Sequence, residues 1–313
     1  MRGMSVAGIW VLSIVGLIIL LIFVAAWKLS DVMLKPRAGT TEQIYEDEAK
    51  SGRLDPAFFE RVEKTPIQIE SRYGYLLDGF VLENELTKRV HNRQKVAVIC
   101  HGYTAGKYAS FVYAQMYMEL GFSVVVYDHR NHGDSGKAFT TMGYYEVYDL
   151  QTVVDWCYER FGEDIRIVTH GESMGAATVL NLLTIDDRIA CTVEDCGYSS
   201  LKKLLIYQIK NGFHLPAFLF YPPANLLVKL RSGCSINKVE PIRGAIFSRT
   251  PILFIHGEKD HFVPCEMARE MYDARIGRKD IYIAKGAKHA ESCVINRTLY
   301  KRHLKAFLNE YYR

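Results

Sequence analysis

Short apolar runs separated by helical segments recur through most of the chain, and this alternation restricts the possible folds most strongly. Each run is five to seven residues long, too short for a helix, and has no polar face. Helical patterns over 108–120, 144–161 and 174–185 lie between the runs. Strands of this kind need cover on both faces, as in a parallel sheet flanked by helices. The runs are KVAVIC, FSVVVYD, DIRIVTH, IACTVED, PILFIHG and DIYIA.

Two further runs with β-type alternation, PIQIE and GYLLDGFVLE, precede these strands. The turn-prone residues 71–74 separate them, which indicates an antiparallel hairpin. We therefore predict an α/β domain over 65–313 with a mostly parallel eight-stranded sheet and helices on both faces. The polar segment 31–64 is predicted to be a linker with short helices.

The N-terminal segment is apolar enough to cross a membrane. No ionisable side chain occurs from Gly3 to Trp27, and a hydrocarbon core needs about 20 helical residues. We therefore predict a single transmembrane anchor over 1–30. A cleaved signal peptide is the alternative, because small residues at 24–26 resemble a cleavage site. The apolar run is, however, longer than the roughly 7–15 residues of a signal h-region.

The side of the membrane that the domain faces stays open. Arg2 precedes the span, whereas Lys28, Lys35 and Arg37 follow it, which favours a cytoplasmic domain. Seven cysteines without a framework spacing also fit a reducing compartment. A short N-terminal tail before a long apolar segment is nevertheless typical of many exported, anchored domains.

Charge and length exclude some functions. The 313 residues can bury a sizeable core without disulfides. The formal net charge is only +4, and basic residues are mixed with acidic ones rather than gathered in a stripe. Nucleic acid is therefore not expected as a partner. The sequence does not indicate whether the protein is a monomer or an oligomer.

Ser173 lies between two glycines directly after an apolar run, in the pattern Gly171-x-Ser173-x-Gly175. The glycines permit a sharp turn from strand to helix that exposes the serine. This turn would place the amide of Met174 at a helix N-terminus, where a developing oxyanion is stabilised. The loop after an earlier strand offers a second amide donor, most simply that of Tyr103.

A serine hydroxyl is a poor nucleophile without a base and a group that orients the base. Asp260 and His289 each follow a later strand, at the sheet edge where parallel strands end. The chain order is therefore Ser, Asp, His, the order of the α/β-hydrolase arrangement. Glu194 and Asp195 are the alternative acids, because they end the strand in between.

Several motifs together resemble the α/β-hydrolase superfamily, from about residue 65 to the C-terminus. The match is most similar to bacterial membrane-anchored serine hydrolases related to monoacylglycerol lipases and to prolyl-oligopeptidase-like, serine aminopeptidase-like enzymes. The resemblance implies that Ser173 is the nucleophile, His289 the general base and acid, and Asp260 the residue that orients the imidazole. It implies the oxyanion hole in the amides of Tyr103 and Met174. The motifs are HG at 101–102, DHRNHGDSG, GESMG, HGEKDHFVP and GAKHA.

No metal or cofactor is predicted. Histidines and aspartates in DHRNHGDSG could be drawn as a metal cluster, but the superfamily uses this turn for loop structure. Cys191 and Cys196 lack a second pair, so a zinc site is not expected. No phosphate loop or dinucleotide motif occurs. The residues expected to hold loops by hydrogen bonds are His101, His129, His132 and Asp134.

The segment at about 198–248 breaks the alternation of strands and helices and is predicted to be a helical cap over the site. It is rich in Leu, Phe and Tyr, with Pro216, Pro222 and Pro223 interrupting its helices. An apolar cap favours acyl or aryl substrates over sugars or phosphates. Packing of the cap on the sheet explains the same composition equally well.

These features predict a serine hydrolase that cleaves carboxylic esters through an acyl-enzyme. Its partners would be a small ester or acyl substrate and the membrane. A peptidase or amidase is the first alternative, since the same triad cleaves amides when the leaving nitrogen can be protonated. An acyl transferase is another. A membrane-tethered binding protein on the same fold is the non-enzymatic alternative.

Overall fold

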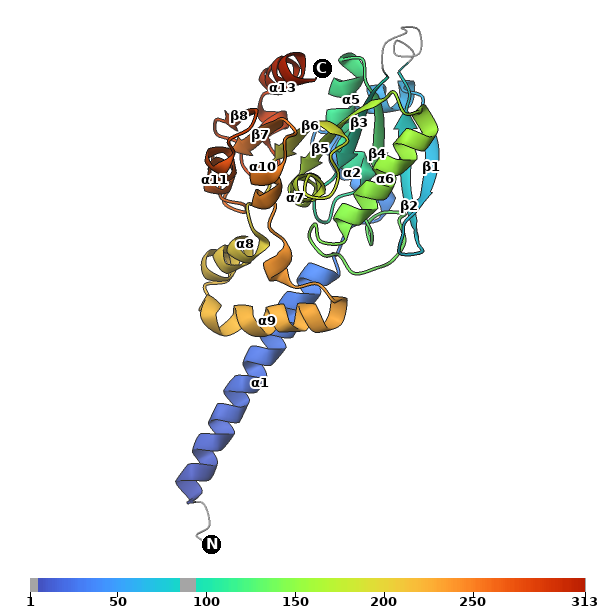
Figure 1. Ribbon diagram of the computed structural model, residues 1–313. Helices are drawn as coiled ribbons and strands as arrows, with labels where there is room; N and C mark the ends of the chain where they lie inside the picture. The colour runs from blue at the N-terminus through green and yellow to red at the C-terminus, as the bar shows by residue number, and fades with distance from the viewer. Residues whose placement is uncertain (1–4, 85–93, 313) are drawn as a thin grey trace.

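Eight strands form one sheet in the computed structural model, which describes residues 5–84 and 94–312 (Figure 1). The order is β1-β2-β4-β3-β5-β6-β7-β8. β1 and β4 flank β2 in antiparallel fashion, whereas all other neighbours are parallel. The predicted hairpin and eight-stranded, mostly parallel sheet are confirmed. The strands are β1 Thr65–Glu70, β2 Leu76–Leu82, β3 Lys95–Cys100, β4 Ser123–Tyr127, β5 Arg166–Glu172, β6 Ile189–Asp195, β7 Ile252–Gly257 and β8 Lys279–Ala284.

Alternate residues of each inner strand pack on opposite faces of the sheet. In β3, Val96, Val98 and Cys100 belong to one buried cluster, and Ala97 and Ile99 belong to the other. Helices α6, α7 and α11 cover the first face, and α5 and α13 cover the second. Both faces of each inner strand are therefore buried, and this is why the strand sequences show no polar face. The helices are α5 Phe111–Glu119, α6 Glu146–Phe161, α7 Met174–Leu182, α11 Glu266–Ala274 and α13 Arg297–Tyr311, with the short α12 Ser292–Ile295 before α13.

The segment 31–64 packs against the domain and is not a free linker. It contains the end of the N-terminal helix and two short helices, α2 Thr41–Lys50 and α3 Pro56–Arg61. Leu54 and Phe58 are buried in the cluster that includes α5. A few apolar side chains in a polar segment are therefore enough to bring it onto the sheet domain.

The cap lies between β6 and β7. It contains α8 Leu201–Tyr207, a π-helical turn η2 Gln208–Gly212, α9 Ala217–Ser232 and a 3-10 turn η3 Ile236–Lys238. The following helix, α10 Ile242–Phe247, contacts α7 and α11 and so returns to the sheet. The cap over the site thus ends before α10.

Two of the three prolines in the cap do not interrupt its helices as expected. Pro216 precedes α9, but Pro222 and Pro223 lie inside it. A proline removes an N–H that would bond to the carbonyl four residues earlier. Those carbonyls belong to Phe218 and Leu219, two residues on an exposed part of the helix.

The N-terminal helix α1, Val6–Leu34, projects from the domain and crosses α9 (Figure 1). It is the one helix among residues 5–84 and 94–312 that is long and apolar enough to span a membrane. Most of its apolar side chains are exposed, whereas Ala26 and Leu34 near its end are fully buried. Arg2, counted above for the orientation, lies outside the described residues.

Candidate active site

Ser173 lies at a strained turn between β5 and α7. Its backbone has φ 56° and ψ −111°, which a residue with a side chain rarely adopts. The two flanking glycines are required by close packing. A Cβ on Gly171 would lie 2.2 Å from the carbonyl oxygen of Gly175, and a Cβ on Gly175 would lie 2.0 Å from that of Cys100. The turn therefore places the hydroxyl at the carboxyl edge of the sheet, where the residue is 8% exposed.

His289 connects Ser173 to Asp260. The imidazole Nε2 lies 2.9 Å from Ser173 Oγ, and Nδ1 lies 2.7 Å from Asp260 Oδ2. Asp260 follows β7 and His289 follows β8, so three strand ends meet at one point. With Nδ1–H donating to the carboxylate, Nε2 is free to accept the serine proton.

The surroundings of Asp260 favour its ionised form. Oδ1 accepts the amides of Phe262 and Val263, each at 2.9 Å. His256 Nε2 lies 3.2 Å from Oδ2. Burial alone would raise the pKa of this carboxyl, but hydrogen bonds from His256 and His289 outweigh burial and hold the pKa well below its usual range. The group is therefore a carboxylate at neutral pH.

The alternative acids lie in different surroundings and do not bond to His289. Asp195 Oδ2 accepts the hydroxyls of Tyr300 at 2.9 Å and Tyr113 at 3.2 Å. Glu194 Oε2 accepts the amide of Gly197 at 2.9 Å. Burial raises the pKa of Asp195 to about 6 and that of Glu194 to about 8.

The backbone offers two candidate donors to an oxyanion. Met174 is the first residue of α7, so the helix leaves its amide without an intrahelical partner. Tyr103 follows Gly102 in the loop after β3. A Cβ on Gly102 would lie 3.5 Å from Ser173 Cβ, so this loop passes close to Ser173. The assignment of both amides to an oxyanion hole stays a prediction.

Histidines hold the loops around the turn. His101 Nε2 accepts the amide of His129 at 2.9 Å, and His132 Nε2 accepts the amide of Thr104 at 3.2 Å. Burial lowers the pKa of both His101 and His132, so both rings are neutral. Their contacts are those of residues that orient loops. For His129 this prediction is wrong, because neither of its ring nitrogens has a hydrogen-bond partner among the described residues.

Two groups of potential metal ligands occur among residues 5–84 and 94–312. In the first, oxygens of Asp78, Asp128 and Asp134 converge on the ammonium of Lys107, at 2.7, 2.8 and 2.6 Å. The lysine ammonium thus already lies at the point where these oxygens converge. In the second, Cys196 lies beside the acid and imidazole just described. Burial raises the pKa of its thiol well above the usual value, which disfavours the thiolate that a metal requires.

Arg53 is a site residue that the sequence did not indicate. Its Nη2 lies 2.6 Å from Oε2 of Glu172, the residue before Ser173, and Nη1 donates to the carbonyl of Ala290, the residue after His289. Nε pairs with Glu48 at 2.8 Å. One guanidinium thus connects the two loops that carry the serine and the histidine. Nothing in the polar segment around Arg53 distinguishes it from a surface arginine.

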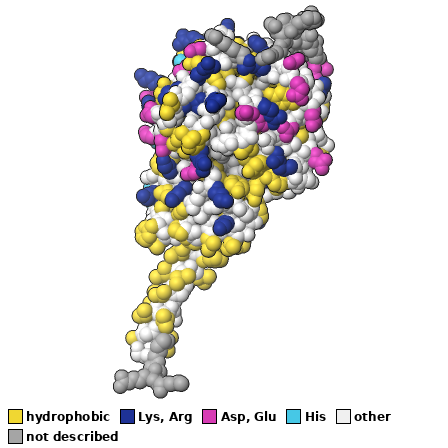
Figure 2. Space-filling view, viewed as in Figure 1, with side chains coloured by type: hydrophobic (Ala, Val, Ile, Leu, Met, Phe, Trp, Pro, Cys, Tyr) yellow, Lys and Arg dark blue, Asp and Glu magenta, His cyan; other side chains and the backbone are white. Residues whose placement is uncertain are grey.

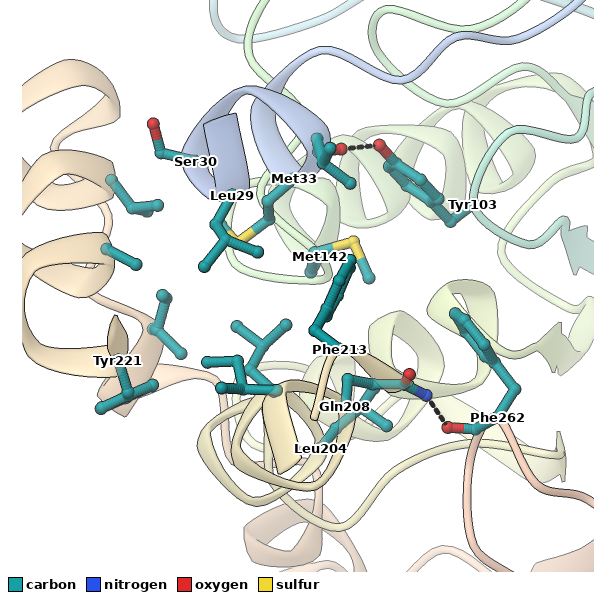
Figure 3. Close-up of a pocket in the computed structure, with 16 residues that line it drawn as sticks. Leu29, Ser30, Met33, Tyr103, Met142, Leu204, Gln208, Phe213, Tyr221 and Phe262 are labelled. Atoms are coloured by element: carbon teal, nitrogen blue, oxygen red, sulfur yellow. Dashed lines mark hydrogen bonds between the residues drawn. The ribbon is translucent and has the colours of Figure 1, made fainter. Parts of the chain in front are cut away.

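An apolar cavity of about 190 Å³ adjoins these groups, between the end of α1 and the cap (Figure 3). Phe262 and Tyr103 form its boundary toward the site. The Phe262 ring centroid lies 5.0 Å from that of the His289 imidazole. The hollow is therefore adjacent to the reacting groups.

The strained serine turn and the order of the strands are typical of one class of protein. The chain is a member of this class, the α/β-hydrolase superfamily of serine hydrolases. It is therefore a hydrolytic enzyme. Over 301 residues it is 31% identical to the uncharacterized protein YqkD of Bacillus subtilis, covering 96% of this chain and 97% of YqkD. Residues 91–193 match the family model described as serine aminopeptidase, S33.

Solved structures support the same fold. The esterase Pf2001 of Pyrococcus furiosus superimposes with a TM-score of 0.69 at 23% identity, covering 89% of this chain and 98% of that one. An acylaminoacyl peptidase of Pyrococcus horikoshii gives a TM-score of 0.63 at 18% identity, covering 82% of this chain and 43% of that one.

Proposed function

We propose that the protein is a membrane-anchored serine esterase that uses Ser173, His289 and Asp260 as its triad. One observation carries the proposal: the continuous hydrogen-bonded series from Ser173 Oγ through His289 to Asp260, with distances of 2.9 and 2.7 Å. A hydroxyl in this arrangement can lose its proton to the imidazole as it attacks.

In the first half of the reaction, Ser173 Oγ attacks the ester carbonyl carbon while His289 Nε2 takes the hydroxyl proton. The carbonyl oxygen becomes an oxyanion, which the amides of Tyr103 and Met174 would stabilise. When the tetrahedral species collapses, the bond to the alcohol oxygen breaks and His289 returns the proton to that oxygen. The alcohol leaves, and the acyl group stays bound to Ser173.

In the second half, water replaces the alcohol. His289 removes a proton from the water as its oxygen attacks the acyl carbon. The bond to Ser173 then breaks, and the imidazolium returns the proton to Oγ. Asp260 keeps the imidazole in the correct tautomer and stabilises the transient positive charge in both halves.

Ester substrates are favoured over peptides by the apolar cavity. It is bounded by Leu, Ile, Met, Val and aromatic side chains, and the side chains that line it include no ionisable carboxyl or amine. A peptide amino terminus would find no counter-charge there. The name of the structurally similar esterase from Pyrococcus furiosus agrees with this preference.

A peptidase or amidase is the second candidate, favoured by the match of residues 91–193 to the serine aminopeptidase model. The same triad serves both reactions, so only turnover distinguishes them. We expect p-nitrophenyl esters to be cleaved faster than aminoacyl p-nitroanilides. The reverse order would favour the peptidase.

We also infer that α1 is retained as a transmembrane anchor and is not cleaved. Ala26 packs against Ala224 and Leu227 of the cap, and the contacts continue through Leu29. A cut at the signal-like residues 24–26 would divide a helix where it is packed. The protein should stay with membranes after carbonate extraction. Recovery in the soluble fraction, with an N-terminus near Trp27, would show a signal peptide instead.

The triad proposal is tested with an active-site label. A fluorophosphonate should label the wild type, and Ser173→Ala should neither be labelled nor cleave p-nitrophenyl esters. Ser13→Ala, which removes an exposed hydroxyl of α1, is the matched control and should behave as the wild type. Equal labelling of Ser173→Ala and wild type would exclude Ser173 as the nucleophile.

A further inference from the structure

The last turns of α1 are built into the enzyme domain. The guanidinium of Arg231 in α9 lies 4.5 Å from the Trp27 ring centroid and 2.5 Å from Asp31 Oδ1. Leu34, the final residue of α1, is fully buried, and the carbonyl of Leu34 accepts the amide of Thr140 at 3.1 Å. A tether alone would need none of these contacts.

This docked end of α1 forms one wall of the apolar cavity. Figure 3 shows Leu29 and Met33 of α1 turned toward the hollow. Leu204, Ile209 and Val228 of the cap form the opposite wall. The cavity therefore exists only while the membrane helix and the cap are in contact.

The polar atoms beside the cavity are already engaged in hydrogen bonds. The Tyr103 hydroxyl donates to the carbonyl of Val32, and the Gln208 amide donates to the carbonyl of Phe262 (Figure 3). The Tyr221 hydroxyl donates to Oδ1 of Asn237 in η3. What remains facing the hollow is almost entirely hydrocarbon, which suits an alkyl chain and offers little to a polar group.

A second, polar hollow also adjoins His289, whose ring contacts Phe262 at the edge of the apolar cavity. The second hollow is lined by Glu48, Arg53 and Glu291 together with His289 itself. His289 therefore has the apolar cavity beyond Phe262 and charged side chains in the second hollow. An amphiphilic ester, with an apolar acyl part and a polar alcohol part, matches this division.

The cap presents an exposed apolar stripe beside the span. Phe218, Leu226 and Leu230 of α9 are 76%, 54% and 73% exposed and lie on one side of the helix. Figure 2 shows hydrophobic side chains along α1 and at the end of the domain from which α1 emerges. If α1 spans the bilayer, this stripe meets the membrane surface.

The charge of the cap fits an anionic lipid surface. Residues 201–248 contain seven basic side chains and one acidic side chain, although the whole chain carries only +4. Basic residues beside a span are attracted to anionic headgroups. The basic residues are Lys202, Lys203, Lys210, Lys229, Arg231, Lys238 and Arg243.

From these observations we propose that the cavity between α1 and the cap binds the acyl chain of an amphiphilic lipid ester taken directly from the bilayer, so that the membrane helix is part of the substrate site. This inference rests on the proposed esterase function. It adds the substrate class, the source of the substrate and a role for α1 beyond anchoring.

Chain-length preference tests the cavity. The full chain in detergent micelles is assayed with p-nitrophenyl butyrate and p-nitrophenyl dodecanoate. Leu29→Trp and Val228→Trp fill the cavity from opposite walls, and each should lower the dodecanoate-to-butyrate ratio of kcat/KM by about tenfold or more, because several methylenes lose their burial. Leu20→Trp, at an exposed position of α1, is the matched control and should leave the ratio unchanged.

Met33→Ala tests the same wall in the opposite direction. It enlarges the cavity and should raise the hexadecanoate-to-dodecanoate ratio of kcat/KM. If the substitutions merely undock α1, Met33→Ala should lower the preference for long chains, as the tryptophan variants do. Unchanged ratios in both tryptophan variants, with fluorophosphonate labelling intact, would overturn the inference alone. A wild type that cleaves neither ester would overturn the esterase proposal as well.

The source of the chain is tested with the ester presented in two ways. Phe218→Glu combined with Leu230→Glu places charge on the exposed stripe. It should lower turnover of a long-chain fluorogenic ester embedded in phosphatidylglycerol vesicles several-fold and leave turnover of soluble butyrate unchanged. Phe247→Glu, on the 71% exposed Phe247 of α10, is the control. Equal vesicle activity of the double variant and the control would show that the chain arrives from solution.

Discussion

Two buried carboxylates lie at neighbouring strand ends beside the nucleophile, Asp195 at the end of β6 and Asp260 after β7. The backbone carbonyl of Asp195 accepts the Ser173 amide at 2.8 Å, so Asp195 is at least as close to Ser173 in the hydrogen-bond network as Asp260 is. Their side chains nevertheless have opposite properties. Burial raises the pKa of Asp195 to about 6, whereas the pKa of Asp260 lies well below its usual range.

The difference comes from the hydrogen-bond partners, because both groups are buried. Asp260 faces two imidazoles, which can carry positive charge, and two backbone amides. Asp195 faces two tyrosine hydroxyls, which cannot. A carboxylate that must stabilise an imidazolium has to be ionised before the reaction begins. The partners of a buried acid, more than its position at a strand end, therefore indicate its role.

Exchanging each acid for its amide should give the largest contrast. Asp260→Asn leaves the imidazole in the wrong tautomer and should lower kcat for ester cleavage by about 10⁴-fold, the loss seen for such a change in a serine protease. Asp195→Asn and Glu194→Gln should each change kcat far less. Ester turnover is measured after circular dichroism has shown that each variant is folded.

The reverse result would contradict the assignment of different roles to Asp195 and Asp260. An inactive Asp195→Asn beside a nearly wild-type Asp260→Asn would move the acid of the triad to the end of β6. The hydrogen bond from His289 Nδ1 to Asp260 would then describe a resting arrangement and not the reacting one.

Arg53 lies on the Asp195 side of this contrast and should have the next largest effect. It pairs with Glu172, and the Tyr113 hydroxyl bonds to both Glu172 and Asp195. Arg53→Met leaves Glu172 buried without its cation and should lower the free energy of unfolding by about 3–5 kcal/mol. Urea unfolding of the full chain in micelles measures the loss.

A second change separates charge from packing. Arg53→Met deprives both Glu172 and Glu48 of their cation, so adding Glu172→Gln removes one of the two unpaired charges and should restore part of the stability. Arg61→Met, on an exposed side chain of the same segment, should have little effect. A loss for Arg61→Met as large as for Arg53→Met would show that the segment, and not the ion pair, is responsible.

The sequence predicted the sheet and the residues that converge at its edge, because that information is local. A glycine-serine-glycine turn after an apolar run specifies a strand, a sharp turn and a helix within a few residues. Asp260 and His289 could be placed because parallel strands end at one edge, and the structure brings both to Ser173.

Contacts between distant segments could not be predicted in this way. Arg53 and Ala290 are 237 residues apart, and no local pattern marks either. The docking of α1 depends on Trp27 and Arg231, which look like an interfacial ring and a surface charge when each is considered alone. The sequence thus indicated an anchor and a cap, but not that the two share a cavity.

The smallest expected effect for a single step of the measurement, one pH unit, is a pH dependence of stability that differs in sign between the two strand ends. Burial raises the pKa of Glu194, next to Asp195, from 4.5 to about 8. Between these values the folded protein keeps a proton that the unfolded chain has released, so wild-type stability falls as pH rises from about 5 to 8, by at most about 1.4 kcal/mol per pH unit. Glu194→Gln cannot ionise at this position, so its urea midpoint should decline less over this range, and it should equal or exceed that of the wild type at the upper end.

Asp260, with its lowered pKa, contributes the opposite slope, with stability lost only as pH falls below about 4. Glu266→Gln, at an exposed position, is the control. Parallel curves of urea midpoint against pH for wild type and Glu194→Gln would show that Glu194 is ionised in the folded protein. The two strand ends would then not differ in the sign of their pH dependence.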